Sequence, residues 1–288
     1  MSKDRGVLYI TSGKDFISKA EKSAESVKSQ HPELPITIYA DREVDHRAFD
    51  DVRSIESFED PGDSILTEKH FPYEENLFLD SDTLVTGDIG DLFELLEQSD
   101  LAAAHNPGRE RWDSKLWKQI DHSLPDAFPE YNAGVIVYRD TESVRELFKN
   151  WDEIYQSLGF HLNQPAFRIA LYESDITPMT LPPEYNFMIH TVGYACGPVR
   201  IFHQGTSEKD LAQFAEIVNS SSQRRVTTWG DYPCRVIRNS DHSLRYQIKI
   251  LDGNRVREVT AQLQREYNHS GVIGVLSKIR EKLLRGLY

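Results

Sequence analysis

Two aspartates one residue apart, Asp80 and Asp82, follow a short apolar run and offer the clearest chemistry in the sequence. In an extended backbone alternate side chains share a face, so we expect the two carboxylates to point the same way. Two like charges about 4 Å apart repel by roughly 4 kcal/mol in a partly buried site. A divalent cation between the carboxylates removes this repulsion, and a proton retained on one of them is the other solution. The spacing alone does not decide between a metal site and a solvated Asx turn after a strand, and the apolar run before it favours the metal.

His203 also follows a strand-like segment, 199–202, and stands before a Gln-Gly pair. A histidine after a strand is more often a hydrogen-bonded core or surface residue than a metal ligand. Together with Asp80 and Asp82, however, it would complete a set of oxygen and nitrogen ligands that suits Mn²⁺ or Mg²⁺. Such a set leaves coordination positions open for phosphate oxygens.

Three amides and a glycine form the other candidate chemistry. Asn132 and Gly134 open a β-branched run, where the glycine lets a ligand approach the backbone and the amide can bind a hydroxyl group. A β-bulge or turn at the start of a strand explains the same pair equally well. Asn163 and Gln164 precede Pro165, which is tolerated in the first turn of a helix. These two amides either cap that helix or bind hydroxyl groups.

A short apolar run at 7–10 and a β-rich segment at 36–39 predict two strands, and apolar residues at helical spacing predict a helix at 16–30 between them. This order implies two parallel strands joined by a crossover helix, as in an α/β fold. Ligands of open parallel sheets bind beyond the carboxyl ends of the strands. Thr11, Ser12 and Asp41 follow the two strands and are therefore candidate ligand-binding residues, although ordinary turn chemistry accounts for each of them singly.

The remaining periodicity continues the alternation of strands and helices. Strands are expected at 52–55, 76–82, 101–104, 131–138 and 199–203. Helices are expected at 64–71, 91–97, 141–158 and 163–171. The segment 105–130 is rich in Pro, Trp and charge without a clear period, which is typical of a lid or binding loop. The proline-containing segment 181–187 is expected to be stiff and non-helical.

The chain has 288 residues, of which 39% are hydrophobic, so it is large enough for one α/β domain with an appendage. No apolar run approaches the roughly 20 residues of a membrane-spanning helix. The N-terminus enters the first strand without a signal-peptide core, so we expect a cytoplasmic protein. The two cysteines, Cys196 and Cys234, form no Cys-x-x-Cys pair and suggest neither a disulfide framework nor a zinc site.

The formal net charge of −13 is unevenly distributed along the chain. Residues 221–288 contain 13 Lys or Arg against 6 Asp or Glu, whereas residues 1–220 contain 20 against 40. The overall acidity argues against general binding of nucleic acid. We predict an acidic catalytic domain at 1–220 and a basic appendage at 221–288 with a partner of its own.

Two β-like runs at 234–237 and 246–251 predict a small hairpin in the appendage, and apolar residues at helical spacing predict an amphipathic helix at 271–288. Four basic residues lie beside that apolar stripe. On an anionic membrane surface each would contribute roughly 1 kcal/mol to binding. The alternatives are packing of the helix on its own domain and packing in a homodimer.

Four short motifs stand in the order that they have in glycosyltransferase family 8, which the chain resembles over about residues 6–206. The motifs lie at 79–83, 132–135, 163–166 and 202–205. The family includes glycogenin and bacterial lipopolysaccharide galactosyltransferases. The resemblance implies a GT-A fold, an α/β fold in which helices flank a mixed, mostly parallel, Rossmann-like sheet. It also implies metal-dependent transfer of a hexose, with retention of configuration, from a UDP-sugar or another nucleoside-diphosphate sugar to a glycan or lipid-linked acceptor.

By this resemblance, Asp80, Asp82 and His203 are the ligands of Mn²⁺ or Mg²⁺, and Asp82 also lies near the ribose and the diphosphate. Thr11 and Ser12 lie where the family's first strand delivers the contacts to uracil and ribose. No carboxylate is clearly placed as a base opposite the sugar. This agrees with a retaining reaction in which the departing diphosphate helps to deprotonate the acceptor.

The resemblance also assigns the sugar pocket. Asn132 and Gly134 match the segment that lines it, and Gln164 faces the reacting carbon. Asn163 stands where the family usually has an aspartate that binds donor-sugar hydroxyls, so the chain departs from the pattern there. Lys69, before the Asp-x-Asp strand, is a candidate for a basic residue near the donor. The family's lysine after the histidine motif is not evident, and only Lys209 is nearby.

Other classes of protein share parts of this pattern. An apolar-Asp-x-Asp-x-Thr sequence also carries the aspartyl nucleophile of haloacid-dehalogenase-type phosphatases, but there it lies near the N-terminus with a downstream lysine and acidic pair. Sugar-phosphate nucleotidyltransferases have a glycine-rich N-terminal loop that this chain lacks. A non-catalytic protein that binds sugar nucleotides with the same fold is the third alternative.

Overall fold

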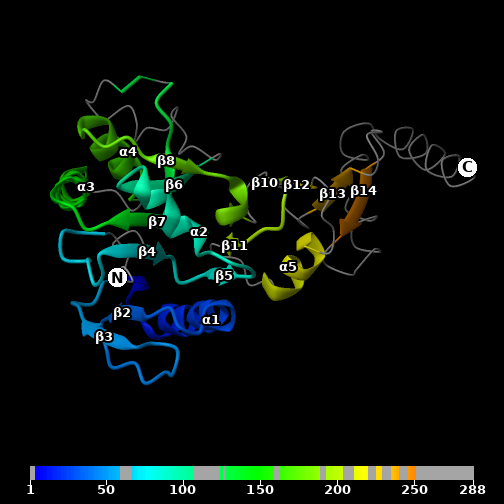
Figure 1. The fold of residues 1–288 in the computed structure, drawn as a ribbon, viewed down its shortest axis with the longest axis horizontal. Helices are drawn as coiled ribbons and strands as arrows, with labels where there is room; N and C mark the ends of the chain where they lie inside the picture. Colours follow the sequence, from blue (N-terminus) through cyan, green and yellow to red (C-terminus); the bar gives the residue numbers. More distant parts are fainter. Residues whose placement is uncertain are drawn as a thin grey trace, which may run out of the picture.

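The structure is a computed structural model of the chain (Figure 1). It describes residues 4–58, 66–106, 124–125, 127–158, 163–188, 193–203 and 211–219, and the backbone of 225–228, 235–239 and 246–250. The predicted helix at 271–288, Cys234, Lys209 and most of the segment 105–130 lie outside these residues. None of the described helices is long and apolar enough to cross a membrane.

Seven strands form the central sheet, in the order β3-β2-β1-β4-β7-β6-β8. They are β1 (Arg5–Thr11), β2 (Ile36–Ala40), β3 (Asp51–Ser54), β4 (Glu75–Leu79), β6 (Leu101–His105), β7 (Tyr131–Arg139) and β8 (Met179–Leu181). Strands β1 to β4 are mutually parallel, β6 and β8 are parallel, and β7 is antiparallel to its neighbours β4 and β6. The predicted α/β fold with a mixed, mostly parallel sheet is confirmed, and β8 is a strand that the sequence did not predict.

The antiparallel direction of β7 decides which residues meet at the binding edge. Leu79, the last residue of β4, pairs with Val135 near the beginning of β7. The carboxyl ends of β1, β2 and β4 therefore share one edge of the sheet with the amino end of β7. Asp41, Asp80 and Asn132 all lie at this edge.

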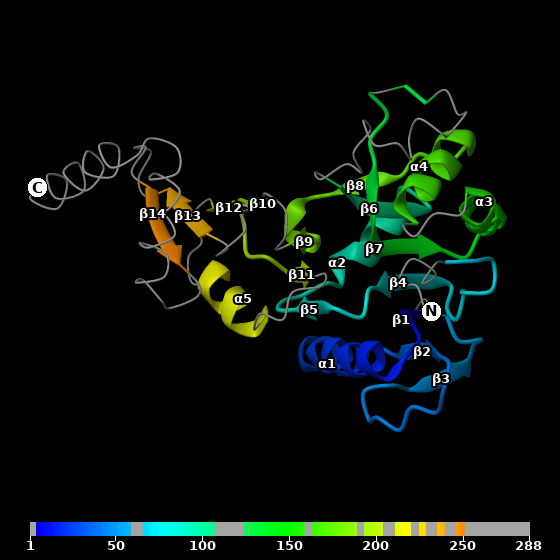
Figure 2. The same ribbon diagram turned by 180° about the vertical axis from the view of Figure 1, so that it is seen from behind.

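Helices cover both faces of the sheet (Figure 2). They are α1 (Lys14–Gln30), α2 (Asp91–Glu94) with the 3-10 turn η2 (Leu95–Glu97), α3 (Glu142–Leu158) and α4 (Gln164–Glu173). Alternate strand residues face opposite sides, so Val7 and Leu77 pack with α1 and α2, whereas Leu8 and Phe78 pack with α3 and α4. The predicted helices at 16–30, 91–97, 141–158 and 163–171 are confirmed with shifts of one or two residues at their ends.

The core between the sheet and α3 is aromatic. Trp151 is fully buried, and its ring centroid lies 4.4 Å from that of Phe167 on α4. The indole N–H of Trp151 donates a 3.0 Å hydrogen bond to the backbone oxygen of Asn163. Because buried aromatic side chains each contribute a few kcal/mol, roughly 1.5–3, this contact holds the beginning of α4 firmly against α3. Gln164 is the first residue of α4, so its backbone is held at a defined place beside the sheet.

Two smaller sheets follow the central sheet in the fold. β5 (Thr83–Val85), β11 (Ile201–His203) and β9 (Phe187–Met188) form one of them, in that order. β10 (Gly193–Ala195), β12 (Arg225–Thr228), β13 (Arg235–Asn239) and β14 (Tyr246–Ile250) form the other. In Figures 1 and 2 this second sheet and α5 (Leu211–Asn219) lie at one end of the molecule, away from the central sheet. The predicted hairpin is present as the β13–β14 pair, and β12 joins it to β10. The boundary between domains at residue 220 stays a prediction.

Two local predictions were wrong. Residues 66–71 of the expected helix 64–71 form no helix, because Leu66, His70 and Phe71 pack into the core from an irregular segment whose turn is closed by a hydrogen bond from His70 N–H to Thr67 O. The segment 181–187 contains a 3-10 turn, η4 (Pro183–Tyr185), because the backbone after Pro182 closes on itself through a Tyr185 N–H bond to the Pro182 oxygen.

Candidate active site

The Asp-x-Asp sequence lies in a tight turn directly after β4. The backbone oxygen of Asp80 accepts two hydrogen bonds from Thr83, one from its backbone N–H over 3.2 Å and one from its hydroxyl over 2.8 Å. The expected extended backbone is therefore wrong here, because these two bonds curl the chain back at residues 80–83. The turn carries both carboxylates toward one side, so they converge without the strand alternation that we predicted.

Helix α1 holds this turn from the outside. The hydroxyl of Ser23 contacts Thr83 Oγ1 at 2.7 Å and Tyr9 Oη at 2.9 Å, and the backbone N–H of Val85 donates to Ser26 Oγ over 2.9 Å. Buried hydroxyl groups need such partners, because an unsatisfied one costs free energy. The two serines of α1 therefore determine where β5 begins, and with it the position of the turn.

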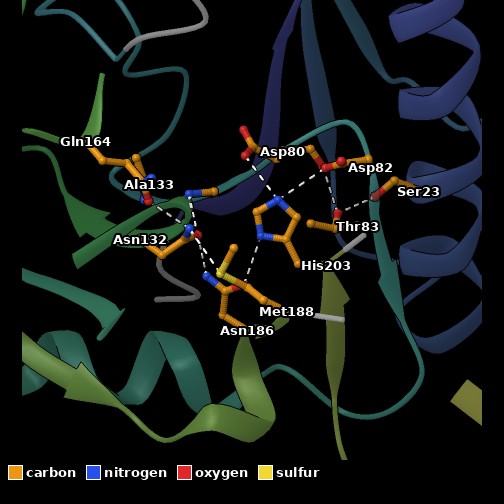
Figure 3. Close-up of polar contacts among 11 residues, drawn as sticks. Ser23, Asp80, Asp82, Thr83, Asn132, Ala133, Gln164, Asn186, Met188 and His203 are labelled. Carbon is orange, nitrogen blue, oxygen red and sulfur yellow. Dashed lines mark hydrogen bonds and ion pairs between the residues drawn. The ribbon is translucent and has the colours of Figure 1, made fainter. Parts of the chain in front are cut away.

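Pairing of β5 with β11 brings the histidine to the aspartates. The two strands are antiparallel, and His203 stands opposite Thr83. Its Nε2 lies 3.2 Å from Asp82 Oδ1 and 3.3 Å from Asp80 Oδ2, as Figure 3 shows. Ligand atoms of the three residues all lie within 4.8 Å of one another. The structure thus brings together the three predicted metal ligands, although metal binding itself stays a prediction.

The electrostatics of this cluster favour a positive charge at its centre. Burial by itself lowers the pKa of the His203 imidazole, but the Asp82 and Asp80 carboxylates outweigh burial and raise that pKa to about 10. Burial has the opposite effect on the Asp82 carboxyl and raises its pKa. The charge and the hydrogen bond of the His203 imidazolium outweigh burial and keep that pKa below its ordinary value. Without a metal, a proton on His203 is the cation that the two carboxylates require.

The geometry also fits a divalent ion. Ligand atoms about 2.1 Å from a six-coordinate ion lie about 3 Å apart when they are adjacent. The separations of 3.2 and 3.3 Å between His203 Nε2 and the two carboxylate oxygens are close to this value. Two carboxylate oxygens and one imidazole nitrogen are ligands that Mn²⁺ and Mg²⁺ accept.

Gly134 lies directly behind the cluster. A Cβ atom at this position would overlap the His203 ring and the Asp80 carboxylate. The Gly134 oxygen also accepts a 2.8 Å hydrogen bond from the Asp80 N–H. The glycine is therefore required by the close approach of the two predicted ligands. The alternative of an irregular strand start is also present, because the pairing of β7 with β6 shifts register between Ala103 and His105.

A chain of amides connects the cluster with Gln164. His203 Nδ1 lies 3.0 Å from Asn186 Oδ1, and Asn186 Nδ2 donates to Asn132 Oδ1 over 2.6 Å. Asn132 Nδ2 donates in turn to Gln164 Oε1 over 2.8 Å (Figure 3). Asn186 was missed by sequence reasoning. It reaches His203 because β9 runs parallel to β11, a pairing between short strands that leaves no periodic signal.

The second group of candidates lies at the ends of β1 and β2. Thr11 is 2% exposed, and its hydroxyl has no hydrogen-bond partner within the part of the chain that the structure describes. The hydroxyl of Ser12 accepts a 3.1 Å hydrogen bond from the backbone of Phe58. Asp41 accepts one from the Gly13 N–H over 3.2 Å and a bidentate pair from Arg42. The Arg42 guanidinium and these donors lower the pKa of Asp41 to about 2.

The remaining candidates are placed less centrally. Asn163 immediately precedes α4, and its side chain makes no capping hydrogen bond, so capping is not its role. Lys69 is exposed on the turn before β4 and makes no ion pair with the Asp-Asp-His cluster. Lys19, which sequence reasoning missed, lies on α1 one turn before Ser23. Its ammonium lowers the pKa of Asp82. Its only sequence signal is its position on the first crossover helix.

No protein-family model matches the chain, and no curated protein matches it in sequence. Solved structures do match. The chain is similar to the galactosyltransferase LgtC in complex with donor and acceptor sugar analogues (TM-score 0.51, 16% identity, 71% of this chain and 88% of that one). It is similar to an active-site variant of LgtC (TM-score 0.52, 14% identity, 78% and 98%). It is also similar to the apo form of the glycosyltransferase GlyE of Streptococcus pneumoniae TIGR4 (TM-score 0.51, 17% identity, 75% and 60%). At these identities the likeness concerns the fold, and the chain has the GT-A-type α/β fold of these glycosyltransferases.

Proposed function

We propose that the protein is a metal-dependent glycosyltransferase that moves a hexose from a UDP-sugar to a glycan or lipid-linked acceptor with retention of configuration. The observation that carries this proposal is the convergence of Asp80, Asp82 and His203 at the carboxyl edge of β4. That edge is where open α/β sheets bind their ligands. The three similar structures named above are glycosyltransferases, which supports the same class for this chain.

Asp80, Asp82 and His203 would hold Mn²⁺ or Mg²⁺ and leave further coordination positions for phosphate oxygens. A bound ion would act as a Lewis acid on the negative charge that develops when the diphosphate departs. The protein contributes by holding the three side chains in place before donor binds. Gly134 leaves room for Asp80 and His203 to pack closely, and the two hydrogen bonds from Thr83 to the Asp80 backbone oxygen fix the turn that carries the carboxylates.

The nucleoside would lie against Thr11, Ser12 and Asp41. A buried hydroxyl without a partner costs about 1–3 kcal/mol, and a polar atom of a bound base or ribose would recover this loss at Thr11. Asp41 is ionised at neutral pH and offers a carboxylate to ribose hydroxyls. Lys19 would supply positive charge near the diphosphate. It is better placed for this role than Lys69, because its ammonium is near enough to lower the pKa of Asp82.

The sugar would lie between the metal cluster and the amides of Asn132, Asn163 and Gln164. The hydrogen-bonded chain from Asn132 to Gln164 contains amides and no carboxylate. Glycosidases instead place two carboxyl groups about 5–10 Å apart across the sugar. Amides in place of carboxylates beside the cluster therefore support front-face departure, in which the diphosphate rather than a side chain deprotonates the acceptor.

The experiment is a test of UDP release. The protein is incubated with Mn²⁺ and a panel of UDP-sugars without acceptor, and slow release of UDP from at least one donor is expected. Addition of EDTA should abolish this release, because the carboxylates and the imidazole cannot hold the diphosphate alone. Binding of UDP without turnover of any donor would instead indicate a non-catalytic binder. Trapping of fluoroberyllate on Asp80 would indicate a phosphatase and contradict the proposal.

The basic charge of residues 221–288 supports a proposal for the acceptor and the location. We propose a cytoplasmic protein whose residues 271–288 contact the membrane peripherally, next to a lipid-linked acceptor. Flotation with anionic liposomes would test this, with the full chain compared to a chain truncated at Gly271. Equal flotation of the two would remove the membrane proposal and favour packing of the helix within the protein or in a homodimer.

A further inference from the structure

Four polar side chains from four separate segments form one hydrogen-bonded chain through the site. His203 ends β11, Asn186 precedes β9, Asn132 lies in β7 and Gln164 begins α4. The first three are at most 6% exposed. Buried amides can be placed in two orientations that exchange oxygen and nitrogen, so the direction of such a chain has to be fixed from outside.

Two backbone groups fix this direction, because a backbone N–H can only donate. Gly134 N–H donates to Asn132 Oδ1 over 3.0 Å, and Ala133 N–H lies 3.4 Å from Gln164 Oε1. The oxygen of the Asn132 amide is therefore the atom near Gly134, and its Nδ2 is the atom that faces Gln164. Asn132 and Gln164 are each oriented by the strand β7 itself.

The orientation of the Asn132 amide also fixes that of Asn186, which contacts His203. Asn132 Oδ1 also accepts from Asn186 Nδ2 over 2.6 Å, so Asn186 turns its oxygen toward His203. An amide oxygen cannot donate, and the Nδ1 atom 3.0 Å away must therefore carry the proton of this bond. The other ring nitrogen, Nε2, faces Asp80 and Asp82.

We propose that Asn132 and Asn186 form a directional relay, through which the Gly134 backbone sets both the tautomer of His203 and the orientation of the Gln164 amide. This inference rests on the proposed function, since it concerns how the metal and sugar sites are positioned. Asn186 is a positioning residue that acts through His203, whose Nε2 it keeps available to a cation. A ligand histidine whose second nitrogen is held in this way is typical of metal sites.

The relay also assigns a role to Gln164. Its Oε1 receives hydrogen bonds from Asn132 Nδ2 and from the Ala133 backbone. Its Nε2 makes no hydrogen bond to any residue of the described ranges and is the group available to a substrate. With its oxygen engaged by β7, Gln164 would donate a hydrogen bond from Nε2 to an oxygen of a bound sugar.

The first test is the affinity for Mn²⁺, measured by isothermal titration in the absence of donor. Asn186→Leu removes the acceptor for Nδ1 and is expected to weaken Mn²⁺ binding about 10–100-fold, the usual effect of losing such a partner. Asn186→Asp keeps an acceptor toward His203 and is expected to bind Mn²⁺ at least as tightly as the wild type. Asn76→Leu is the matched control, because the Asn76 side chain is fully buried and, among the described residues, bonds to the backbone of Tyr73 and not to the cluster.

The second test separates the two ends of the relay. Asn132→Asp still accepts from Gly134 and Asn186 but cannot donate to Gln164. Its Mn²⁺ affinity should stay close to that of the wild type, whereas UDP release should fall up to about 100-fold because Gln164 loses its orientation. A purely structural role of Asn132 would lower both quantities together or neither.

The third test reads the tautomer directly. In protein labelled with ¹⁵N-histidine and saturated with Mg²⁺, the His203 signals are identified by their loss in His203→Gln. Two-bond correlations should show Nδ1 protonated in the wild type and in Asn186→Asp, and a changed pattern in Asn186→Leu.

Three results would overturn the relay: protonation of Nε2 alone in the wild type, wild-type Mn²⁺ affinity in Asn186→Leu, or equal loss of affinity in Asn186→Leu and Asn186→Asp. If these occur in a protein that binds Mn²⁺, the proposed function survives. A wild type that does not bind Mn²⁺ would overturn the relay and the proposed metal clamp together.

Discussion

The metal cluster and the Thr11–Ser12–Asp41 group lie at the same edge of the sheet, but they are prepared for ligands in different ways. In the cluster, His203 contacts two carboxylates and an amide, and a proton substitutes for the cation. In the other group, a buried hydroxyl of Thr11 has no partner among the described residues. The first region is preorganised as a charge site, whereas the second leaves one hydrogen bond for a ligand to complete. This difference predicts that substitutions in the cluster act on charge and catalysis, and substitutions in the second group act on binding alone.

The largest effect is expected for Asp82→Ala. Loss of one carboxylate removes several kcal/mol of charge stabilisation, so UDP release should fall at least about 1,000-fold and Mn²⁺ binding should be lost. Asp88→Ala is the matched control, because Asp88 is a mostly exposed carboxylate that pairs with His31 and not with the cluster. Unchanged binding of Mn²⁺ and UDP by Asp82→Ala would show that the site is misassigned.

Gly134→Ala tests whether the cluster depends on close packing. The added methyl group overlaps Asp80 and His203, so the free energy of unfolding should fall by about 1–3 kcal/mol and Mn²⁺ affinity should fall with it. Gly197→Ala should change neither, because a Cβ atom there meets open space. Thermal unfolding and Mn²⁺ titration of both variants give the comparison. Equal behaviour of the two variants would contradict the packing argument.

The pH dependence of stability tests the charge of the cluster. The pKa of His203 is about 10 in the folded protein and about 6.5 when unfolded, so the folded state binds the proton more tightly. Its contribution to stability should be complete below about pH 6.5 and should disappear as the pH rises toward 10. Metal-free protein treated with EDTA should therefore lose stability over this range in thermal unfolding experiments. A slope that is identical in His203→Gln would mean that another group is responsible.

Lys19→Met is expected to have a smaller effect, because Lys19 acts on the cluster from a distance. UDP affinity should fall about 5–10-fold, corresponding to roughly 1 kcal/mol, and the loss should diminish at high salt as exposed charges are screened. Lys14→Met, an exposed residue at the start of the same helix, should leave UDP affinity unchanged. Equal UDP affinities of the two variants would remove Lys19 from the phosphate site.

The smallest effect is expected in the second region. Thr11→Val removes the unpartnered hydroxyl, so UDP affinity should fall about fivefold while the free energy of unfolding stays the same or rises slightly. Thr37→Val is the opposite control, because its buried hydroxyl bonds to Tyr73 Oη at 2.8 Å. It should lose about 1 kcal/mol of stability and keep its UDP affinity. The distinction between the two regions fails if Thr11→Val destabilises the protein as Thr37→Val does.

Local patterns in the sequence were sufficient for most elements of the fold. The short, continuously buried runs of β1 and β2 and the apolar stripes of α1, α3 and α4 record how each segment meets the core, because burial acts on every residue in turn. The strand–helix–strand order then implied the parallel sheet and its binding edge. The residue types of Asp80, Asp82, Asn132, Gln164 and His203 made each of them a candidate, and the order of the four motifs, shared with glycosyltransferase family 8, joined them into one predicted site.

Tertiary structure alone decided how these residues meet. The register of β5 against β11 places His203 beside Asp82, although 121 positions separate them in the sequence. The pairing of β9 with β11 brings in Asn186, and the Thr83 bonds replace the expected strand at the Asp-x-Asp sequence by a turn. Gly134 is required only once Asp80 and His203 pack against it. Such contacts join short segments that are distant in sequence, and short strands carry too few residues for their own periodicity to specify a partner or a register.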